Sequence, residues 1–230
     1  MVRAVAMSTT KPRPYDDAPR LPGAFGPLRV AAADPATASA KVDQVDVRTL
    51  VQGEIYELEV GPGRGGFMFE RADAEPRAGL VGLEVRRKWA AIVDGRLQKR
   101  GYGARARVFA EDAKVALPRL SPDGVLERAY LHFPDPWWKK RHTKRLVMGD
   151  VFLSEMARLI RPGGELYIQT DVEERAAQYE EQLATCVQFA PNGEGGTARI
   201  AENPYGARSP REHRAIADGL PVFRLLYRRV

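Results

Sequence analysis

The stretch ELEVGPGRGG, residues 57–66, decides how this chain is expected to fold. Its first four residues end the apolar and β-branched segment IYELEV, which favours a strand, and three glycines follow at positions 61, 63 and 65. Glycines directly after a strand let the backbone turn tightly and approach a ligand closely. Because FMFERA then starts a helical segment, the stretch predicts a strand, a glycine loop and a helix.

Segments with strand and helix character alternate along the rest of the chain. Further strands are expected at AGLVGLEV, ARARVFA, VLERAYLHF, ELYIQTD and the terminal VFRLLYRR. Helices are expected between them: one carries Trp89, Val93 and Leu97 on a single face, and FLSEMARLI and VEERAAQYEEQLATC form two more. This alternation is typical of βαβ units. We therefore predict an α/β, Rossmann-like fold with a mostly parallel, doubly wound sheet.

The composition bounds the domain organisation and the partner. The 230 residues suit one domain, and the first 50 are rich in Pro, Ala and Asp, which favours a flexible or irregular arm before a single domain at residues 51–230. A net charge of +6 and a pI near 9.5 favour a polyanionic partner.

The single cysteine, Cys186, excludes an internal disulfide and any multi-cysteine metal site, and we expect no metal. The apolar runs are too short for a membrane span, and no secretory signal is visible, so a cytoplasmic protein is expected. The sequence leaves the choice between monomer and homodimer open.

Acidic residues follow the predicted strands, where a doubly wound sheet binds its ligands. In chain order they are Glu84, Asp112, Asp135 and Asp171. A G-x-G-x-G loop would also fit a dinucleotide, but the Glu59 carboxylate just before it would repel a pyrophosphate and suits a cationic ligand. Glu84, 19 residues past Gly65, is placed to accept hydrogen bonds from ribose hydroxyls, and Asp112 would lie at the adenine edge. We therefore expect S-adenosylmethionine as the cofactor.

The segment LHFPDPWWKKRHTKR, residues 131–145, carries the candidate acceptor site. Pro134 and Pro136 restrict the backbone around Asp135, which pre-organises its carboxylate. Trp137 and Trp138 can stack on bases or pack the loop onto the core. The cations that follow, either a phosphate-binding patch or a solvated face, are Lys139, Lys140, Arg141, Lys144 and Arg145.

These motifs, with GLEV, EDA, RPGGELYIQTD and SPREHR, occur in an order that resembles the bacterial tRNA (guanine-N7)-methyltransferases over residues 54–230. The resemblance implies a class I methyltransferase fold with helices on both faces of the sheet and an antiparallel C-terminal strand. It implies that Glu59, Glu84 and Asp112 contact S-adenosylmethionine beside the loop glycines Gly61, Gly63 and Gly65, and that Asp135 is the catalytic acid next to it.

The same resemblance implies a tRNA partner, with a guanine in the variable loop as the expected target. The residues expected to hold the guanosine are Lys139, Asp171, Ser209, Pro210, Arg211 and Glu212. Those expected to touch the tRNA are Lys140, Arg141, His142, Thr143, Lys144, Arg145 and Leu146.

The chain departs from the family pattern near its C-terminus. The family usually has Thr, a basic residue, Phe and Glu where this chain has Ser209-Pro-Arg-Glu212. Ser-Pro-x-Glu also suits a helix start with a capping box, and Asp171 is placed to cap the helix after it. Both segments therefore have a structural as well as a substrate-binding interpretation, and the arm before residue 50 matches nothing in the family.

Guanine N7 carries a lone pair and no proton, so its methylation needs no general base. We therefore expect Asp135 to orient the base and stabilise developing positive charge, not to remove a proton. Three other functions fit parts of the sequence: a methyltransferase for an exocyclic amine or another RNA site, a non-catalytic RNA-binding protein with this fold, and a nicotinamide oxidoreductase.

Overall fold

The computed structural model describes residues 15, 17–23, 43–134 and 147–230. Within these residues, seven strands form the main sheet in the order β4-β3-β2-β6-β7-β9-β8. Their bounds are β2 Ile55–Val60, β3 Ala78–Leu83, β4 Ala106–Phe109, β6 Leu126–His132, β7 Ile160–Thr170, β8 Phe189–Pro191 and β9 Phe223–Arg229. Strands β2, β3, β4, β6 and β7 pair in parallel, whereas β9 is antiparallel to β7 and β8. The predicted sheet and its antiparallel C-terminal strand are confirmed.

Helices cover both faces of this sheet, as expected. Helices α2 (Gly66–Ala74) and α3 (Arg87–Lys99) pack over β2, β3 and β4 on one face. The other face packs against α1 (Val47–Leu50), α4 (Ala113–Ala116), α5 (Asp150–Leu159) and α6 (Glu173–Ala184). Helix α5 ends before the RPGG segment, as predicted, but that segment belongs to β7.

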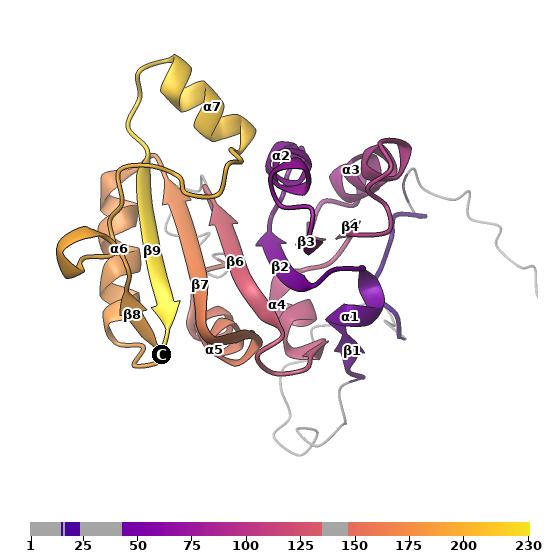
Figure 1. The fold of residues 1–230 in the computed structure, drawn as a ribbon, viewed down its shortest axis with the longest axis horizontal. Coiled ribbons are helices and arrows are strands. Elements are labelled where there is room, and N and C mark those ends of the chain that lie inside the picture. The colour runs from indigo at the N-terminus through magenta and orange to yellow at the C-terminus, as the bar shows by residue number, and fades with distance from the viewer. Residues whose placement is uncertain (1–14, 16, 24–42, 135–146) are drawn as a thin grey trace, which may run out of the picture.

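The carboxyl ends of the parallel strands meet where the strand order reverses. The chain runs outward from β2 to β3 and β4 and then returns to β6 on the other side of β2. In Figure 1 the arrowheads of β2, β6 and β7 point toward the end of the molecule where α2 and α7 (Pro210–Ala217) lie, and β9 points the opposite way. This end is where a doubly wound sheet binds its ligand.

Alternation along the central strands separates an apolar face from a polar one, because successive side chains of a strand point to opposite faces. Leu58, Leu131 and Ile168 belong to the main apolar core. The alternate positions carry buried polar or aromatic side chains instead, namely Glu57, Glu59, Tyr130, His132, Tyr167 and Gln169. The buried polar face of the sheet therefore extends to the carboxyl ends of the strands.

The described residues before position 51 pack against the domain. Strand β1 (Val45–Asp46) pairs in parallel with β5 (Leu120–Ser121), and Val47 is fully buried. Closer to the N-terminus, Ala18 and Leu21 are buried, and the Ala110 N–H donates to the Pro19 carbonyl at 2.6 Å. The sequence did not predict this small sheet.

Candidate active site at the carboxyl edge of the sheet

The glycine loop follows β2 in the conformation that its sequence predicts. Gly61, Gly63 and Gly65 have φ values of 77°, 56° and 76°, in the left-handed region that disfavours side chains. A Cβ on Gly65 would lie 2.3 Å from Val93 Cγ1, so this glycine lets α2 start close to α3. A Cβ on Gly61 would meet no described atom within 4 Å, which leaves room for a ligand against its backbone.

The Glu84 carboxylate lies against this loop, as predicted from its position after β3. It is buried, and its Oε2 accepts a hydrogen bond from the Gly63 N–H at 2.9 Å. Its Oε1 accepts from the N–H and Nε of Arg86 at 2.9 and 3.0 Å. These contacts fix the carboxylate beside the glycine backbone. A bound adenosine could use the remaining lone pairs of its oxygens.

Asp112 lies after β4 at the same edge of the sheet but is exposed. Its carboxylate caps α4 by accepting from the Lys114 N–H at 3.0 Å. The neighbouring Glu111, which the sequence analysis did not single out, is buried and accepts from Arg20 and from the Leu21 N–H. Glu111, the residue before the predicted Asp112, therefore holds the segment around Arg20 and Leu21 at this edge of the sheet.

Glu59 forms a buried pair with His132, a residue that the sequence analysis missed. The Glu59 Oε1 and His132 Nδ1 atoms are 2.8 Å apart, and each side chain is 3% exposed. Because an ionised carboxylate only accepts, Nδ1 carries the shared proton. Glu59 Oε2, His132 Nε2 and Gln169 Oε1 are buried and find no hydrogen-bond partner within the described part of the chain.

These three atoms come from neighbouring strands, because Glu59 lies on β2, His132 on β6 and Gln169 opposite His132 on β7. A buried polar atom without a partner costs free energy unless a ligand satisfies it. The arrangement therefore suits a polar ligand at the carboxyl edge, and a free carboxylate oxygen in particular suits a cation.

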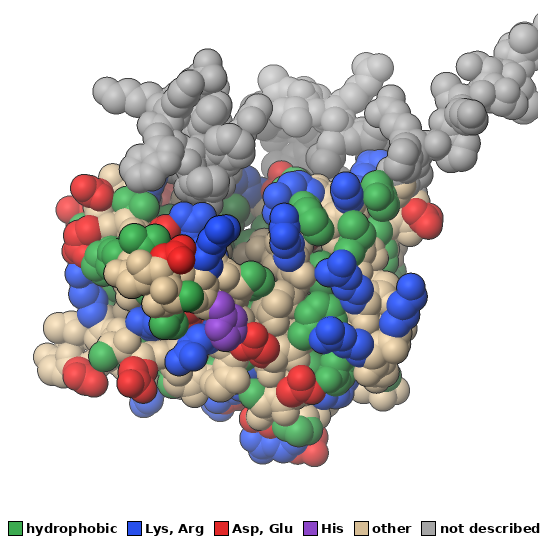
Figure 2. Space-filling view, turned by 90° about the horizontal axis from the view of Figure 1, so that it is seen from above, with side chains coloured by type: hydrophobic (Ala, Val, Ile, Leu, Met, Phe, Trp, Pro, Cys, Tyr) green, Lys and Arg blue, Asp and Glu red, His purple; other side chains and the backbone are tan. Residues whose placement is uncertain are grey.

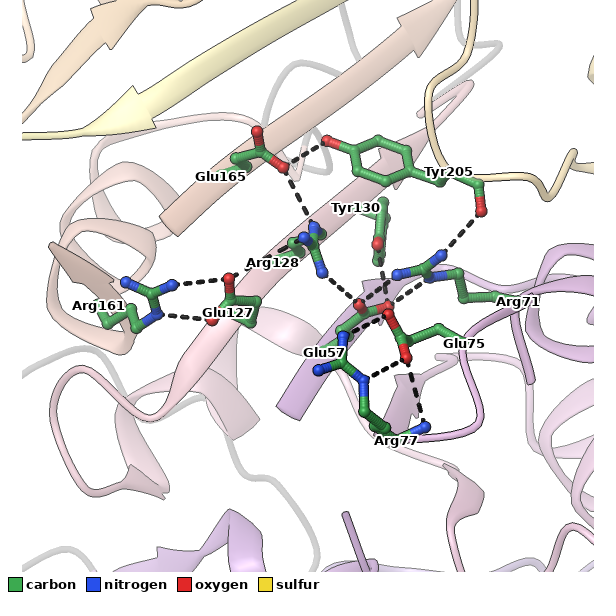
Figure 3. Close-up of polar contacts among 10 residues, drawn as sticks. All are labelled: Glu57, Arg71, Glu75, Arg77, Glu127, Arg128, Tyr130, Arg161, Glu165 and Tyr205. Carbon is green, nitrogen blue, oxygen red and sulfur yellow. Dashed lines mark hydrogen bonds and ion pairs between the residues drawn. The ribbon is translucent and has the colours of Figure 1, made fainter. Parts of the chain in front are cut away.

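A second buried network lies farther down the same polar face (Figure 3). Glu57 accepts from Arg71 Nε and Nη2 at 2.8 and 2.7 Å, from Arg128 Nη1 at 3.0 Å and from the Tyr130 hydroxyl at 2.9 Å. These four donors share one carboxylate that is 1% exposed. Burial raises the pKa of Tyr130 well above its usual value, and the Glu57 charge adds to the effect.

The same network holds the segment that leads into α7. Arg71 Nη1 donates to the Tyr205 carbonyl at 2.8 Å, and the Tyr205 hydroxyl donates to Glu165 at 3.2 Å (Figure 3). Burial is the largest single effect on the pKa of Arg71 and would lower it, but the hydrogen bond with Glu57 and the interactions with Tyr130, Glu57 and Glu75 together outweigh burial, so the pKa is raised. The guanidinium therefore stays charged and links α2, β2 and the Tyr205 segment.

The Ser209–Glu212 segment begins α7 and lies directly on the start of α2. Ser209 is the N-cap, its Oγ accepts from the Glu212 N–H at 3.2 Å, and Pro210 occupies the first turn. A Cβ on Gly66 would lie 2.5 Å from Pro210 Cγ, so the two helix starts are in contact. The structure thus brings this segment to the glycine loop although 143 residues separate Ser209 from Gly66.

Glu212 does not complete the predicted capping box. Its carboxylate is fully buried and accepts from Arg224 Nε and Nη2 at 3.0 and 2.9 Å and from Asn203 Nδ2 at 2.9 Å. The reason is that α7 packs its third residue inward, toward β9. Glu212 is therefore bound to protein groups in this structure.

Asp171 and Arg211, two of the residues expected to hold the guanosine, contact each other. Arg211 Nε and Nη2 lie 3.1 and 2.5 Å from Asp171 Oδ2. Asp171 is half-buried and Arg211 is exposed. Asp171 does not cap α6, whose N-cap is Val172. The Arg211 guanidinium also lies 5.6 Å from the Phe133 ring, and Phe133 has a φ of 46° just before Pro134.

Asp135, Lys139 and the predicted RNA-binding residues 140–146 lie outside the described residues. The two flanks of this segment are described: Phe133, whose N–H donates to the Gln169 carbonyl at 2.8 Å, and the residues from Val147 onward. Across the described ranges, no three His, Cys, Asp or Glu side chains are grouped to hold a metal ion. None of the helices in those ranges is long and apolar enough to span a membrane.

Comparison with known proteins identifies the family. The model of a family described as "Putative methyltransferase" matches residues 54–225. A tRNA (guanine-N(7)-)-methyltransferase of Anaeromyxobacter dehalogenans is 39% identical over 75% of this chain and 85% of its own length. A protein of the same name from Myxococcus xanthus is 34% identical over 73% of this chain and 80% of its own. The chain belongs to the tRNA (guanine-N(7)-)-methyltransferase family.

The similarity to solved structures supports the fold of this chain but does not indicate its substrate or reaction. The 16S rRNA methyltransferase KamB superposes with a TM-score of 0.54 at 17% identity, covering 80% of this chain and 91% of its own. The [4+2]-cyclase SpnF superposes with a TM-score of 0.53 at 18% identity, covering 80% and 78%. A methyltransferase and a cyclase share this architecture, so the chemistry of this family member has to be argued from its site.

Proposed function

We propose that the protein transfers the methyl group of S-adenosylmethionine to N7 of a guanine in tRNA, giving 7-methylguanosine. The observation that carries this proposal is the membership of the chain in a family whose curated relatives bear that activity as their name. The site geometry agrees with it, because the glycine loop, Glu59 and Glu84 converge at the carboxyl edge of the sheet.

The residues at this edge fit S-adenosylmethionine, which supplies an electrophilic methyl group on a sulfonium and carries an ammonium but no phosphate. The open space at Gly61 admits a ligand against the backbone. The free Oε2 of Glu59 offers a buried acceptor to a cation, whereas it would repel a pyrophosphate. Glu84 would accept from the ribose hydroxyls and Asp112 would lie toward the adenine.

Asp135 would act on the acceptor base. Guanine N7 attacks through its lone pair, so no proton has to leave before the methyl group is transferred. A carboxylate held between two prolines can accept hydrogen bonds from guanine N1–H and N2–H₂, and it stabilises positive charge as it develops on the ring. In the sequence it comes three residues after His132, the last residue of β6.

Substrate contacts would come from further residues named in the sequence analysis. The pair of Asp171, which follows β7, and Arg211, in the first turn of α7, would bind the guanosine with Ser209, Pro210 and Lys139. Glu212 would act by supporting α7 through Arg224. The basic residues 140–146 would bind the tRNA backbone, and the variable loop is the target region that we favour.

The remaining features of the proposal follow from the substrate. The protein would act on tRNA in the cytoplasm, and the proposed methyl transfer needs no metal. Residues 51–230 would form the catalytic domain, with residues 1–50 as an arm in which Arg20 and Leu21 are tied to the sheet edge by Glu111.

Methyl transfer to unmodified tRNA tests the proposal directly. The protein is incubated with labelled S-adenosylmethionine and a tRNA transcript, and the label is located by nucleoside analysis. We expect 7-methylguanosine as the labelled product. The Asp135→Asn variant should lose most of the rate. Because Asp135 is not expected to act as a general base, the pH–rate profile of the variant should keep the same shape on the acid side as that of the wild type. Label on an exocyclic amine would refute the assigned target, and failure to bind S-adenosylmethionine would favour the non-catalytic RNA-binding alternative.

A further inference from the structure

A dense group of cations lies on α3 and its two ends, in a part of the sequence separate from the segment that was predicted to bind RNA. Residues 86–100 contain six Arg or Lys side chains, all exposed. We call them the α3 basic face: Arg86, Arg87, Lys88, Arg96, Lys99 and Arg100. The only acid in the segment, Asp94, is buried and accepts from Arg107 Nε at 2.8 Å, so it faces away from this surface.

This face accounts for much of the positive charge of the protein. The segment 86–100 has a net charge of +5, and residues 139–145 contribute another five cations without an acid. Because the whole chain has a net charge of +6, all the other residues together are net negative. A polyanion is therefore attracted to two places on this chain, and the α3 basic face is the one that lies within the described residues.

Helix stability does not explain the charges at the start of α3. Arg86, Arg87 and Lys88 occupy the N-cap and the first turn of α3, where the helix dipole disfavours cations, and that turn contains no acid. The dipole favours the cations at the other end of the helix, Arg96 and Lys99 in the last turn and the C-cap Arg100. Three cations at the N-cap and in the first turn form an arrangement that suits an anionic ligand.

The α3 basic face begins at the candidate active site. Arg86 donates to Glu84, the acid expected at the cofactor ribose, at 3.0 Å. Next to it, the half-buried Trp89 ring lies 5.1 Å from the Arg64 guanidinium of the glycine loop and 6.0 Å from Lys88 Nζ. From there the 13 residues of α3 run for about 20 Å. Figure 2, which looks onto the carboxyl edge, shows Lys and Arg side chains gathered over this helix.

We propose that the α3 basic face binds backbone phosphates of the tRNA outside the methylated nucleotide, as a second RNA surface. This inference rests on the proposed function. With the target guanine at the carboxyl edge between β2 and β6, the RNA that leads away from it would follow α3. A contact with the backbone outside the target base would fix the direction of the tRNA across the site.

Neutralising three cations of this face that make no contact with Glu84 tests the inference. The triple variant Lys88→Gln, Arg96→Gln and Lys99→Gln removes three exposed charges and keeps good helix formers. Because each phosphate contact contributes about 0.7–0.9 to the slope of log affinity against log salt, the slope should become shallower by about 2. The affinity for a tRNA transcript should fall roughly tenfold or more at low salt, the KM for tRNA should rise, and cofactor affinity should stay unchanged.

A matched control distinguishes the effect of these local charges on tRNA binding from the effect of the net charge of the protein. Arg77, Arg161 and Arg228 are exposed cations near the opposite ends of the strands, and replacing all three by Gln changes the net charge equally. Loss of tRNA affinity in the α3 triple alone supports the inference. Equal losses in both triples, or an unchanged salt slope in the α3 triple, would overturn it.

The same measurements distinguish this inference from the proposed function. If wild-type protein methylates tRNA and the α3 triple binds as wild type does, the inference fails and the function stands. If wild-type protein binds tRNA through this face but makes no 7-methylguanosine, the proposed function fails and the inference stands.

Discussion

Replacing Gly65 by Ala should destabilise the protein through two separate effects. The residue has a φ of 76°, and a left-handed conformation costs an alanine about 1–2 kcal/mol. The new Cβ would also lie 2.3 Å from Val93 Cγ1, inside a core where Val93 is fully buried. Overpacking of this kind adds about 1–3 kcal/mol. We expect a total loss of about 2–5 kcal/mol in the free energy of unfolding.

Urea denaturation of Gly65→Ala and Gly101→Ala separates the two effects. Gly101 follows α3 with a φ of 81°, and a Cβ there would meet no described atom within 4 Å, so it reports the backbone cost alone. The difference between the variants is the steric part, about 1–3 kcal/mol. In the background Val93→Ala this difference should shrink, because the clashing methyl groups are gone. Equal losses for the two glycine variants would refute the steric reasoning.

Four further predictions follow from the described contacts. Gly61→Ala should lose about as much stability as Gly101→Ala, since both have positive φ and open space, but calorimetry should show weaker cofactor binding only for Gly61→Ala. His132→Leu should weaken S-adenosylhomocysteine binding roughly tenfold or more by freeing the Glu59 carboxylate, whereas His132→Asn, which keeps a donor near the Nδ1 position, should restore most of it. Binding of 5′-methylthioadenosine, which lacks the ammonium, should change little in either variant, and equal loss for both ligands would contradict the role of Glu59. Arg224→Met should cost about 3–5 kcal/mol of unfolding free energy because it leaves the fully buried Glu212 without its cation, and the double variant with Glu212→Leu should recover part of it. Burial raises the pKa of Tyr130, Tyr167 and Tyr205, so these tyrosines stay neutral in the folded protein when the unfolded chain ionises near pH 10. The free energy of unfolding should therefore fall as the pH rises above 10, by roughly 1.4 kcal/mol per pH unit for each of these tyrosines. An increase in tyrosinate absorbance at a lower pH than unfolding would contradict this.

The basic segment at residues 140–146 and Asp135 remain sequence predictions, because they lie outside the described residues. The described acids Glu84 and Asp112 follow β3 and β4 at the edge of the sheet, where a simple rule expects them. The carboxyl ends of parallel strands meet at one edge, so acids that follow successive strands have to gather there. Glu84 illustrates the rule, since its carboxylate accepts the Gly63 N–H although 21 residues separate them.

The buried polar face of the sheet could have been predicted by comparing alternate residues along each strand. Glu57 and Glu59 alternate with Leu58 and Val60, and the same alternation places Tyr130 and His132 on one face of β6. Applied to these strands, this pattern would have indicated a buried polar face. It would not have indicated which carboxylate pairs with His132.

The sequence by itself determined the strand, glycine loop and helix, the alternation that produces the sheet, and the edge at which the acids meet. These features depend on local backbone preferences and on a general topological rule. Only the tertiary structure decided the partners: His132 for Glu59, Arg211 for Asp171 and Arg224 for Glu212. The physical reason is that hydrogen bonds are short and directional, so the register of the strands and the packing of α7 on α2 select one partner among many residues of suitable charge.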